Sequence, residues 1–238
     1  MKDVFSKVEV LARKFRADNG LSLTEAINVK SLVRKLNILT IYRPLSAEAA
    51  GLSLRTDDDD RFILVNSNSS RGRQHFTIAH ELYHLYYDKN PQPHLCRVEG
   101  RSREERQANM FASALLMPYE GMLSMLPAEA IEKKRVHIAH VLRMEQYFGV
   151  SRSTLLLRLK EVDLITESQY EALSQLSVIQ TAREYGYDVS LYRAGNEGLV
   201  IGDYGEKART LFEQERISEG HYDELLNVIS YGQGGDCD

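Results

Sequence analysis

Apolar positions in the first part of the chain follow a helical spacing first and a strand-like pattern afterwards. The first helix is predicted from four apolar residues at helical spacing, Phe5, Val8, Ala12 and Phe15, and Asn19-Gly20 then predicts its end. A second helix is expected over residues 29–36. Three strands are expected next, over residues 38–42, 51–56 and 61–65. The last two strands form a hairpin, and the four aspartates of residues 57–60 are interpreted as its solvated turn.

The middle of the chain predicts two longer helices separated by a loop. A polar segment over residues 66–72 leads into a helix over residues 73–87. Residues 89–102 contain two prolines and a glycine, which favours a loop. The second helix is expected over residues 103–117, because Pro118 cannot continue it.

The remaining sequence predicts short helices and a little strand. Helical segments are expected over residues 119–125, 138–148, 152–161 and 167–185, and a further helical pair near the end. Two short strands are expected over residues 189–192 and 199–201, and a frayed tail over residues 232–238. The pattern as a whole indicates a mostly helical α+β protein. We divide it into residues 1–125, 126–166 and 167–238.

Composition limits the class of protein. The chain has 238 residues, 43% of them hydrophobic and 27% charged, which is typical of a globular protein. Two cysteines do not suffice for a disulfide framework. The first residues lack the apolar core of a signal peptide, and no apolar run approaches the roughly 18 residues of a membrane span. We therefore expect a cytoplasmic protein that does not associate with membranes.

Charge is distributed unevenly along the chain. The formal net charge is −4, which argues against a wholly basic nucleic-acid binder. That value combines +1 for residues 1–132, +6 for residues 133–160 and −11 for residues 161–238. The basic stretch keeps a DNA contact open as an alternative. The acidic end is interpreted as a segment that either senses a partner or packs against the basic stretch.

The strongest chemical signal lies in the predicted helix of residues 73–87, which contains the run His80-Glu81-Leu82-Tyr83-His84. Two histidines four apart project from one face of a helix, so both imidazoles can reach the same ion. The glutamate between them is placed to hold a water molecule and to act as a general base. This is the His-Glu-x-x-His pattern of zinc hydrolases.

A third ligand is expected from the helix of residues 103–117. Its apolar face is formed by Ala108, Phe111, Ala112, Leu115 and Leu116. Extended backwards, this face includes Glu105, and an inward carboxylate is costly unless it is paired or binds a metal. Asn109 lies one turn further along, where its side-chain oxygen can accept the second ring N–H of a ligating histidine.

These residues predict a hydrolytic site. His80, His84 and Glu105 hold Zn²⁺, which activates a water molecule and polarises a carbonyl, and Glu81 moves the proton to the leaving amine. The spacing does not select the group that stabilises the oxyanion or contacts the substrate. The candidates are Tyr83, Tyr87, His94 and Arg73.

Three runs of this sequence resemble the ImmA/IrrE-type metallopeptidases: Phe76-Thr77-Ile78-Ala79-His80-Glu81-Leu82-Tyr83-His84, then Glu105-Arg106-Gln107-Ala108-Asn109-Met110-Phe111-Ala112, then Leu115-Leu116-Met117-Pro118. The resemblance is specific over about residues 66–118 and looser up to about residue 166. Tyr83 stands where the family usually has glycine, which changes no ligand. In the family, the second run supplies the glutamate ligand, which corresponds to Glu105.

The resemblance implies a fold and a role. The fold would be a thermolysin-like minimal zincin with a small three-stranded sheet and active-site helices. A helix-turn-helix-like helical part and a small acidic α/β region would follow. Family members are bacterial or phage-borne cytoplasmic proteins, and they typically cleave a helix-turn-helix repressor or antitoxin encoded nearby. Stress response, toxin–antitoxin control and mobile elements are the settings that this implies. The acidic region from about residue 184 matches the family least.

Two alternatives belong to different functional classes. The basic helix pair could place Arg152 or Arg158 against phosphates, which would make the protein a DNA-binding regulator with a vestigial metal site. A partner-binding protein built on an inactive metalloprotease fold is the other. We favour a supporting role for the basic helices, because the leucines at residues 155–157 and 159 indicate packing. The sequence does not indicate whether the chain forms a homo-oligomer.

Overall fold

A computed structural model describes residues 2–88, 94–97 and 102–230 of the chain, which is mostly helical with one mixed sheet. The helices before the sheet and around the site are α1 (Lys2–Asp18), α2 (Val29–Lys35), α3 (Arg71–Tyr87) and α4 (Arg103–Leu116). The strands are β1 (Ile38–Arg43), β2 (Ala49–Arg55), β3 (Arg61–Asn66), β4 (His94–Arg97) and β5 (Val200–Ile201). The later helices are α5 (Tyr119–Ser124), α6 (Ala128–Glu132), α7 (Ile138–Phe148), α8 (Arg152–Glu161), α9 (Glu167–Ser174), α10 (Val178–Glu184), the 3₁₀ helix η1 (Ser190–Tyr192), α11 (Tyr204–Glu213) and α12 (Glu219–Ser230).

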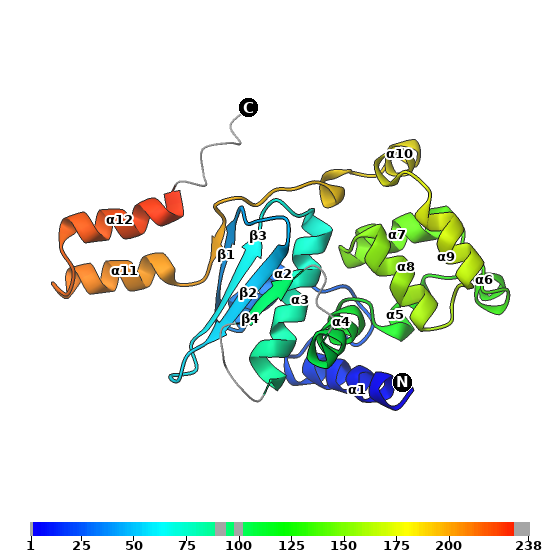
Figure 1. The fold of residues 1–238 in the computed structure, drawn as a ribbon, viewed down its shortest axis with the longest axis horizontal. Coiled ribbons are helices and arrows are strands. Elements are labelled where there is room, and N and C mark those ends of the chain that lie inside the picture. The colour runs from blue at the N-terminus through cyan, green and yellow to red at the C-terminus, as the bar shows by residue number, and fades with distance from the viewer. Residues whose placement is uncertain (1, 89–93, 98–101, 231–238) are drawn as a thin grey trace.

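The sheet lies in the middle of the molecule and has the strand order β4-β2-β3-β1-β5 (Figure 1). β1 and β3 run parallel, and the other neighbouring pairs are antiparallel. The predicted hairpin of β2 and β3 is confirmed, with the aspartates at its turn. In β1 buried and half-buried residues alternate, because successive side chains of a strand point to opposite faces.

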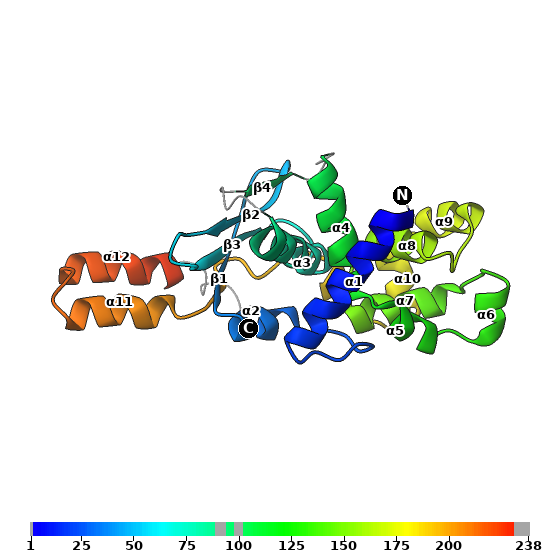
Figure 2. The same cartoon turned by 90° about the horizontal axis from the view of Figure 1, so that it is seen from below.

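The helices gather on one side of the sheet, except for one pair. Figures 1 and 2 show α5 to α10 on the side of α4, while α11 and α12 form a hairpin that projects from the opposite side. α3 lies between the sheet and α4 and packs against both. None of the helices in the described part of the chain combines the length and apolar character that crossing a bilayer requires.

The core joins α1, α3, α4 and α8 to the sheet. Its fully buried side chains include Ile63, Ile78, Leu82, Phe111, Leu115 and Leu159. The residues that the helical spacing assigned to the inner face of α4 are all buried, so the predicted orientation of this helix is confirmed. This orientation matters because it fixes where the side chains at the start of α4 point.

Four details of the prediction are wrong. In the described part of the chain the sheet has five strands and not three, because β4 forms within the predicted loop of residues 89–102 and β5, the strand predicted over residues 199–201, adds to β1. The predicted strand over residues 189–192 is largely the 3₁₀ helix η1. The predicted helix over residues 167–185 is two helices, α9 and α10, and α6 was missed. The expected tail lies outside the described residues.

The part after residue 166 contributes to the sheet. β5 pairs with β1, with Thr40 opposite Ile201 and Ile41 opposite Val200. The strand is too short for its own pattern to predict its partner, since pairing over a long separation in sequence depends on the tertiary fold. This region therefore includes a strand of the sheet that lies beneath α3.

Candidate metal centre

The helix α3 brings His80, Glu81 and His84 to one buried place. These side chains are 2%, 0% and 6% exposed. Residues four apart lie on the same face of a helix, and here that face is covered by the sheet and α4. Polar side chains at this depth need partners, because burying an unpaired polar group costs free energy.

The two imidazoles and a carboxylate point at one another. His80 Nε2 and His84 Nε2 are 3.1 Å apart. Glu105 on α4 places its Oε2 3.4 Å from His80 Nε2 and its Oε1 3.8 Å from His84 Nε2. Two nitrogens bound to one tetrahedral zinc at about 2.0–2.1 Å would be roughly 3.3–3.4 Å apart. The three residues therefore form a group that can hold a metal ion.

The outer ring nitrogens fix the tautomers of both histidines. His80 Nδ1 lies 2.9 Å from Asn109 Oδ1, and His84 Nδ1 lies 2.6 Å from Asp88 Oδ2. Both partners are acceptors, so each Nδ1 carries the hydrogen and each Nε2 presents a lone pair. Two lone pairs that face each other at 3.1 Å repel unless a cation or a proton lies between them. This arrangement suits a metal ion.

Glu105 reaches the site because of how α4 begins. Ser102 is the N-cap, and its Oγ accepts a hydrogen bond from the backbone N–H of Glu105 at 3.1 Å. Glu105 is 8% exposed, whereas its neighbour Glu104 is exposed, as the helical spacing predicted. Asn109, one turn further, lies beside His80, where the sequence placed it.

Two partners of the site were not predicted from the sequence. Ser53 on β2 donates a hydrogen bond from its Oγ to Glu81 Oε2 at 2.5 Å and so orients this carboxylate. Asp88, which ends α3, lies one turn after His84, and that spacing alone could have identified it. Ser53 had no comparable signal, because it comes from a strand nearly thirty residues earlier.

Gly51 keeps β2 close to α3. A Cβ at this position would lie 2.6 Å from Thr77 Cγ2 and 2.8 Å from the Leu64 carbonyl oxygen. Any larger residue would push the strand away from the helix, since real atoms do not approach so closely. The glycine therefore holds Ser53 within reach of Glu81.

Cys96 on β4 lies near the same residues. It is buried, and one ligating atom each from His80, Glu81 and Cys96 also falls within 4.8 Å of the others. Burial raises the pKa of the Cys96 thiol, and the carboxylates of Glu81 and Glu105 raise it further. The set with His80, His84 and Glu105 is the better donor set, because it contains both histidines of the motif and a carboxylate, the donors of catalytic zinc sites of the His₂Glu type.

The remaining candidates for substrate contact differ in placement. Tyr83 and Tyr87 pack against Phe111 with ring centroids 5.7 and 5.4 Å away, which makes them part of the hydrophobic packing. Burial raises the pKa of Tyr87 to about 12. Arg73 is exposed in the first turns of α3. His94 lies in β4, and its side chain is outside the described ones.

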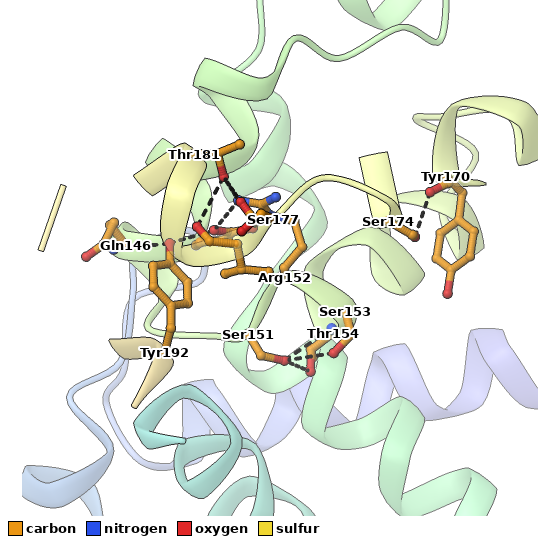
Figure 3. A network of polar contacts seen from close by, with 12 residues as sticks. Gln146, Ser151, Arg152, Ser153, Thr154, Tyr170, Ser174, Ser177, Thr181 and Tyr192 are labelled. Atoms are coloured by element: carbon orange, nitrogen blue, oxygen red, sulfur yellow. Dashed lines mark hydrogen bonds and ion pairs between the residues drawn. The ribbon is translucent and has the colours of Figure 1, made fainter. Parts of the chain in front are cut away.

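Arg152 and Arg158 are not available for phosphate contacts, which corrects the alternative that assigned them to DNA. They are 4% and 0% exposed. Arg152 donates to Thr181 Oγ1 at 3.1 Å (Figure 3). It also pairs with the buried Glu145, to which Tyr192 donates at 2.6 Å. Arg158 pairs with Glu9 of α1 and also donates to a backbone carbonyl. Both arginines therefore connect helices inside the protein.

The turn before α8 is also covered. A Cβ on Gly72 would lie 2.8 Å from the backbone nitrogen of Ser151, so α3 and this turn touch directly. His75 on α3 lies with its Nδ1 2.8 Å from the carbonyl oxygen of Gly149. The end of α8 that a helix-turn-helix protein presents to DNA is thus docked on the helix of the metal centre.

The chain matches a known protein family over the segment that contains the residues of the site. A family model described as IrrE N-terminal-like domain matches residues 33–160, which is more than half of the chain. The match begins in α2 and ends in α8, so it includes the histidines, Glu81, Glu105 and Asn109. Among the curated proteins, none matches the chain.

Proposed function

Because the chain belongs to the Peptidase_M78 family of IrrE N-terminal-like domains, which indicates a zincin-like metallopeptidase, we propose that it is a zinc-dependent endopeptidase. The observation that carries this proposal is the pair of inward Nε2 atoms 3.1 Å apart, next to the Glu105 carboxylate. Their outer nitrogens are already held by Asn109 and Asp88. Such outer partners raise the basicity of ligating histidines and fix their orientation.

The chemistry divides between the metal and Glu81. His80, His84 and Glu105 would hold zinc, which when bound supplies Lewis-acid activation of water and of the peptide carbonyl. The Glu81 carboxylate accepts the proton of the attacking water and passes it to the leaving amine. Ser53 donates a hydrogen bond to one oxygen of this carboxylate and so fixes its orientation beside the histidines.

The substrate that we propose is a helix-turn-helix repressor or antitoxin encoded nearby, whose cleavage relieves repression. Its support is the resemblance of the histidine and glutamate runs to ImmA/IrrE-type metallopeptidases, together with the family match. We place the reaction in the cytoplasm. DNA binding by α8 has no support, since Arg152 and Arg158 are buried.

The test is co-expression of the chain with the product of the adjacent gene. The wild type should shorten this partner, and Glu81→Gln should abolish cleavage while the protein still binds zinc, because Glu81 is the base and not a ligand. Glu104→Gln, on the exposed side of α4, is the matched control and should cleave normally. If the wild type and Glu81→Gln cleave the partner equally well, Glu81 is not the general base. If the wild type leaves the partner intact both at rest and under stress, the product of the adjacent gene is not the substrate.

A further inference from the structure

A cavity of about 340 Å³ lies where the starts of α3 and α8 meet. Ser70, the N-cap of α3, lines it, and so do Ser151 and Ser153 at the start of α8. The first turn of α10 contributes Val178 and Ile179. Pockets for organic ligands usually have volumes of about 300–1,000 Å³. This cavity is therefore large enough for a small organic molecule.

The positive ends of two helices lie side by side at this cavity. A Cβ on Gly72, in the first turn of α3, would lie 2.8 Å from the backbone nitrogen of Ser151, so the two helix starts touch. Each helix start has N–H groups without an intrahelical partner and a partial positive charge of roughly half an elementary charge. Two such ends at one place favour a negatively charged group beside them.

Arg152 is the one charged side chain among the described residues that line the cavity. It is 4% exposed, and its Nε and Nη2 donate to Glu145 and Thr181. Figure 3 shows the side chain extending from the start of α8 toward Thr181, so the guanidinium lies between α8 and α10. Its Nη1 is buried and has no hydrogen-bond partner in the described part of the chain. A buried donor without an acceptor costs free energy, so a ligand that accepts from Nη1 recovers that cost.

Serine hydroxyls add further hydrogen-bond donors. Ser70 begins α3, but its side chain makes no capping hydrogen bond, so its hydroxyl is available to a ligand. Ser153 is exposed, and its Oγ lies 3.1 Å from Ser151 Oγ at the start of α8 (Figure 3). Ser174 at the end of α9 also lines the cavity. Hydroxyls can donate to an anion, and no carboxylate belongs to the described lining.

We propose that this cavity binds a small organic carboxylate with an apolar body. The two helix starts, Arg152 Nη1 and the hydroxyls favour a negative charge. A single charge suits the site better than a doubly charged phosphate group, because Glu145 already pairs with Arg152. Leu156, Val178 and Ile179 line the cavity and contact the apolar part of the ligand. Burial keeps a DNA backbone away from Arg152, whereas a molecule small enough to enter the cavity reaches it.

This site is separate from the metal centre and does not depend on the proposed peptidase function. Ser70 precedes His80 by ten residues, which is about 15 Å along α3. A ligand in the cavity contacts the starts of α3, α8 and α10 together. It therefore ties the helical part to the helix that carries the histidines. A ligand that binds only the folded state also stabilises that state by mass action.

Two probes of the same shape test the proposal on the zinc-loaded full chain. Benzoate carries a carboxylate, and benzamide carries a neutral amide in its place. We expect the wild type to bind benzoate at least about 10-fold more tightly than benzamide, since charge-assisted hydrogen bonds are the stronger ones. Ligand-observed NMR titration measures both dissociation constants. Phenyl phosphate should bind more weakly than benzoate. Removing zinc should change the benzoate constant by less than about 2-fold, because the metal ligands lie further along α3.

Three variants connect this binding to the cavity. Ser70→Asp puts a carboxylate at the cavity and keeps a preferred N-cap residue on α3. It should weaken benzoate binding at least about 10-fold and benzamide binding less than about 3-fold, because like charges repel. Thr166→Asp makes the matching change at the N-cap of α9, outside the cavity, and should keep both constants within about 2-fold. Ile179→Trp fills the cavity and should weaken both probes by about 10-fold or more.

The inference is overturned if the wild type binds benzoate no more tightly than benzamide. It is also overturned if benzoate binding disappears when zinc is removed, because the carboxylate then binds the metal. Tighter binding of phenyl phosphate than of benzoate would show that the proposed ligand class is wrong. Unchanged benzoate binding in Ser70→Asp, or a loss in Thr166→Asp as large as in Ser70→Asp, would place the probe elsewhere. If Ser70→Asp does not fold, Ile179→Trp decides the question, and normal benzoate binding by that variant overturns the inference.

Discussion

Replacing Asn109 with alanine removes the hydrogen bond that orients His80. In the wild type, His80 Nδ1 donates to Asn109 Oδ1 at 2.9 Å. Without it, the imidazole is free to carry its proton on either nitrogen, and only one of these forms offers a lone pair at Nε2. The ring is also free to turn away from His84 and Glu105. Both effects weaken metal binding and leave the ligands themselves in place.

The magnitude follows from the chemistry of such partners. Losing an outer hydrogen bond of a ligating histidine costs about 10- to 100-fold in metal affinity, or about 1.4–2.7 kcal/mol. Asp88→Ala removes the corresponding bond of His84, which is 2.6 Å long. Because the two bonds hold different rings, we expect their effects to be roughly additive in free energy. The double variant should then bind zinc about 10²- to 10⁴-fold more weakly.

The assay is competition for zinc between the protein and a chromophoric chelator at pH 7.5. Asn109→Asp serves as the conservative variant, since a carboxylate also accepts from His80 Nδ1. It should restore affinity to within about 3-fold of the wild type or exceed it. Urea unfolding of the metal-free proteins reports whether a variant has lost stability as well as affinity.

Unchanged zinc affinity in Asn109→Ala would refute the reasoning, because the bond would then not set the orientation of His80. The reasoning would also be refuted if the lower free energy of unfolding of the variant fully explained its loss of zinc affinity. A double variant no weaker than either single one would show that the two bonds do not act on separate ligands.

Three further predictions concern how the helical part is attached. Gly72→Ala should destabilise the protein by about 1–3 kcal/mol in urea unfolding, because the new Cβ would meet the Ser151 backbone at 2.8 Å. Alanine favours helices more than glycine does, so the helix propensity alone predicts the opposite sign. A gain in stability would therefore contradict the prediction. Burial lowers the pKa of His75 below its ordinary 6.5, with positively charged neighbours adding to the effect. The unfolded state then binds more protons just below pH 6.5, so the wild type should lose stability as the pH falls from 7 to 5, and His75→Gln should lose less. Arg152→Met should cost about 3–5 kcal/mol by leaving Glu145 buried without its ion pair, and adding Glu145→Gln should recover part of that loss; no recovery would show that burial of the charge is not the cause.

The sequence by itself determined the parts of the site that lie on single helices. The spacing of His80 and His84 predicted their common face, and the apolar face of α4 predicted that Glu105 and Asn109 point inward. These predictions depend only on the period of the helix, which is local and nearly invariant. The family that the motif resembles is confirmed by the match over residues 33–160.

Only the tertiary structure decided how distant segments meet. Ser53 beside Glu81, β4 within a predicted loop and β5 beside β1 all depend on pairing between residues far apart in sequence. The leucines of residues 155–157 and 159 favoured a packed role for the basic helices, but they did not show that Arg152 and Arg158 themselves are buried. Whether an arginine faces solvent depends on which carboxylate the fold brings to it, and both partners come from other helices. Local period fixes the direction of a side chain, while long-range packing fixes what that side chain meets.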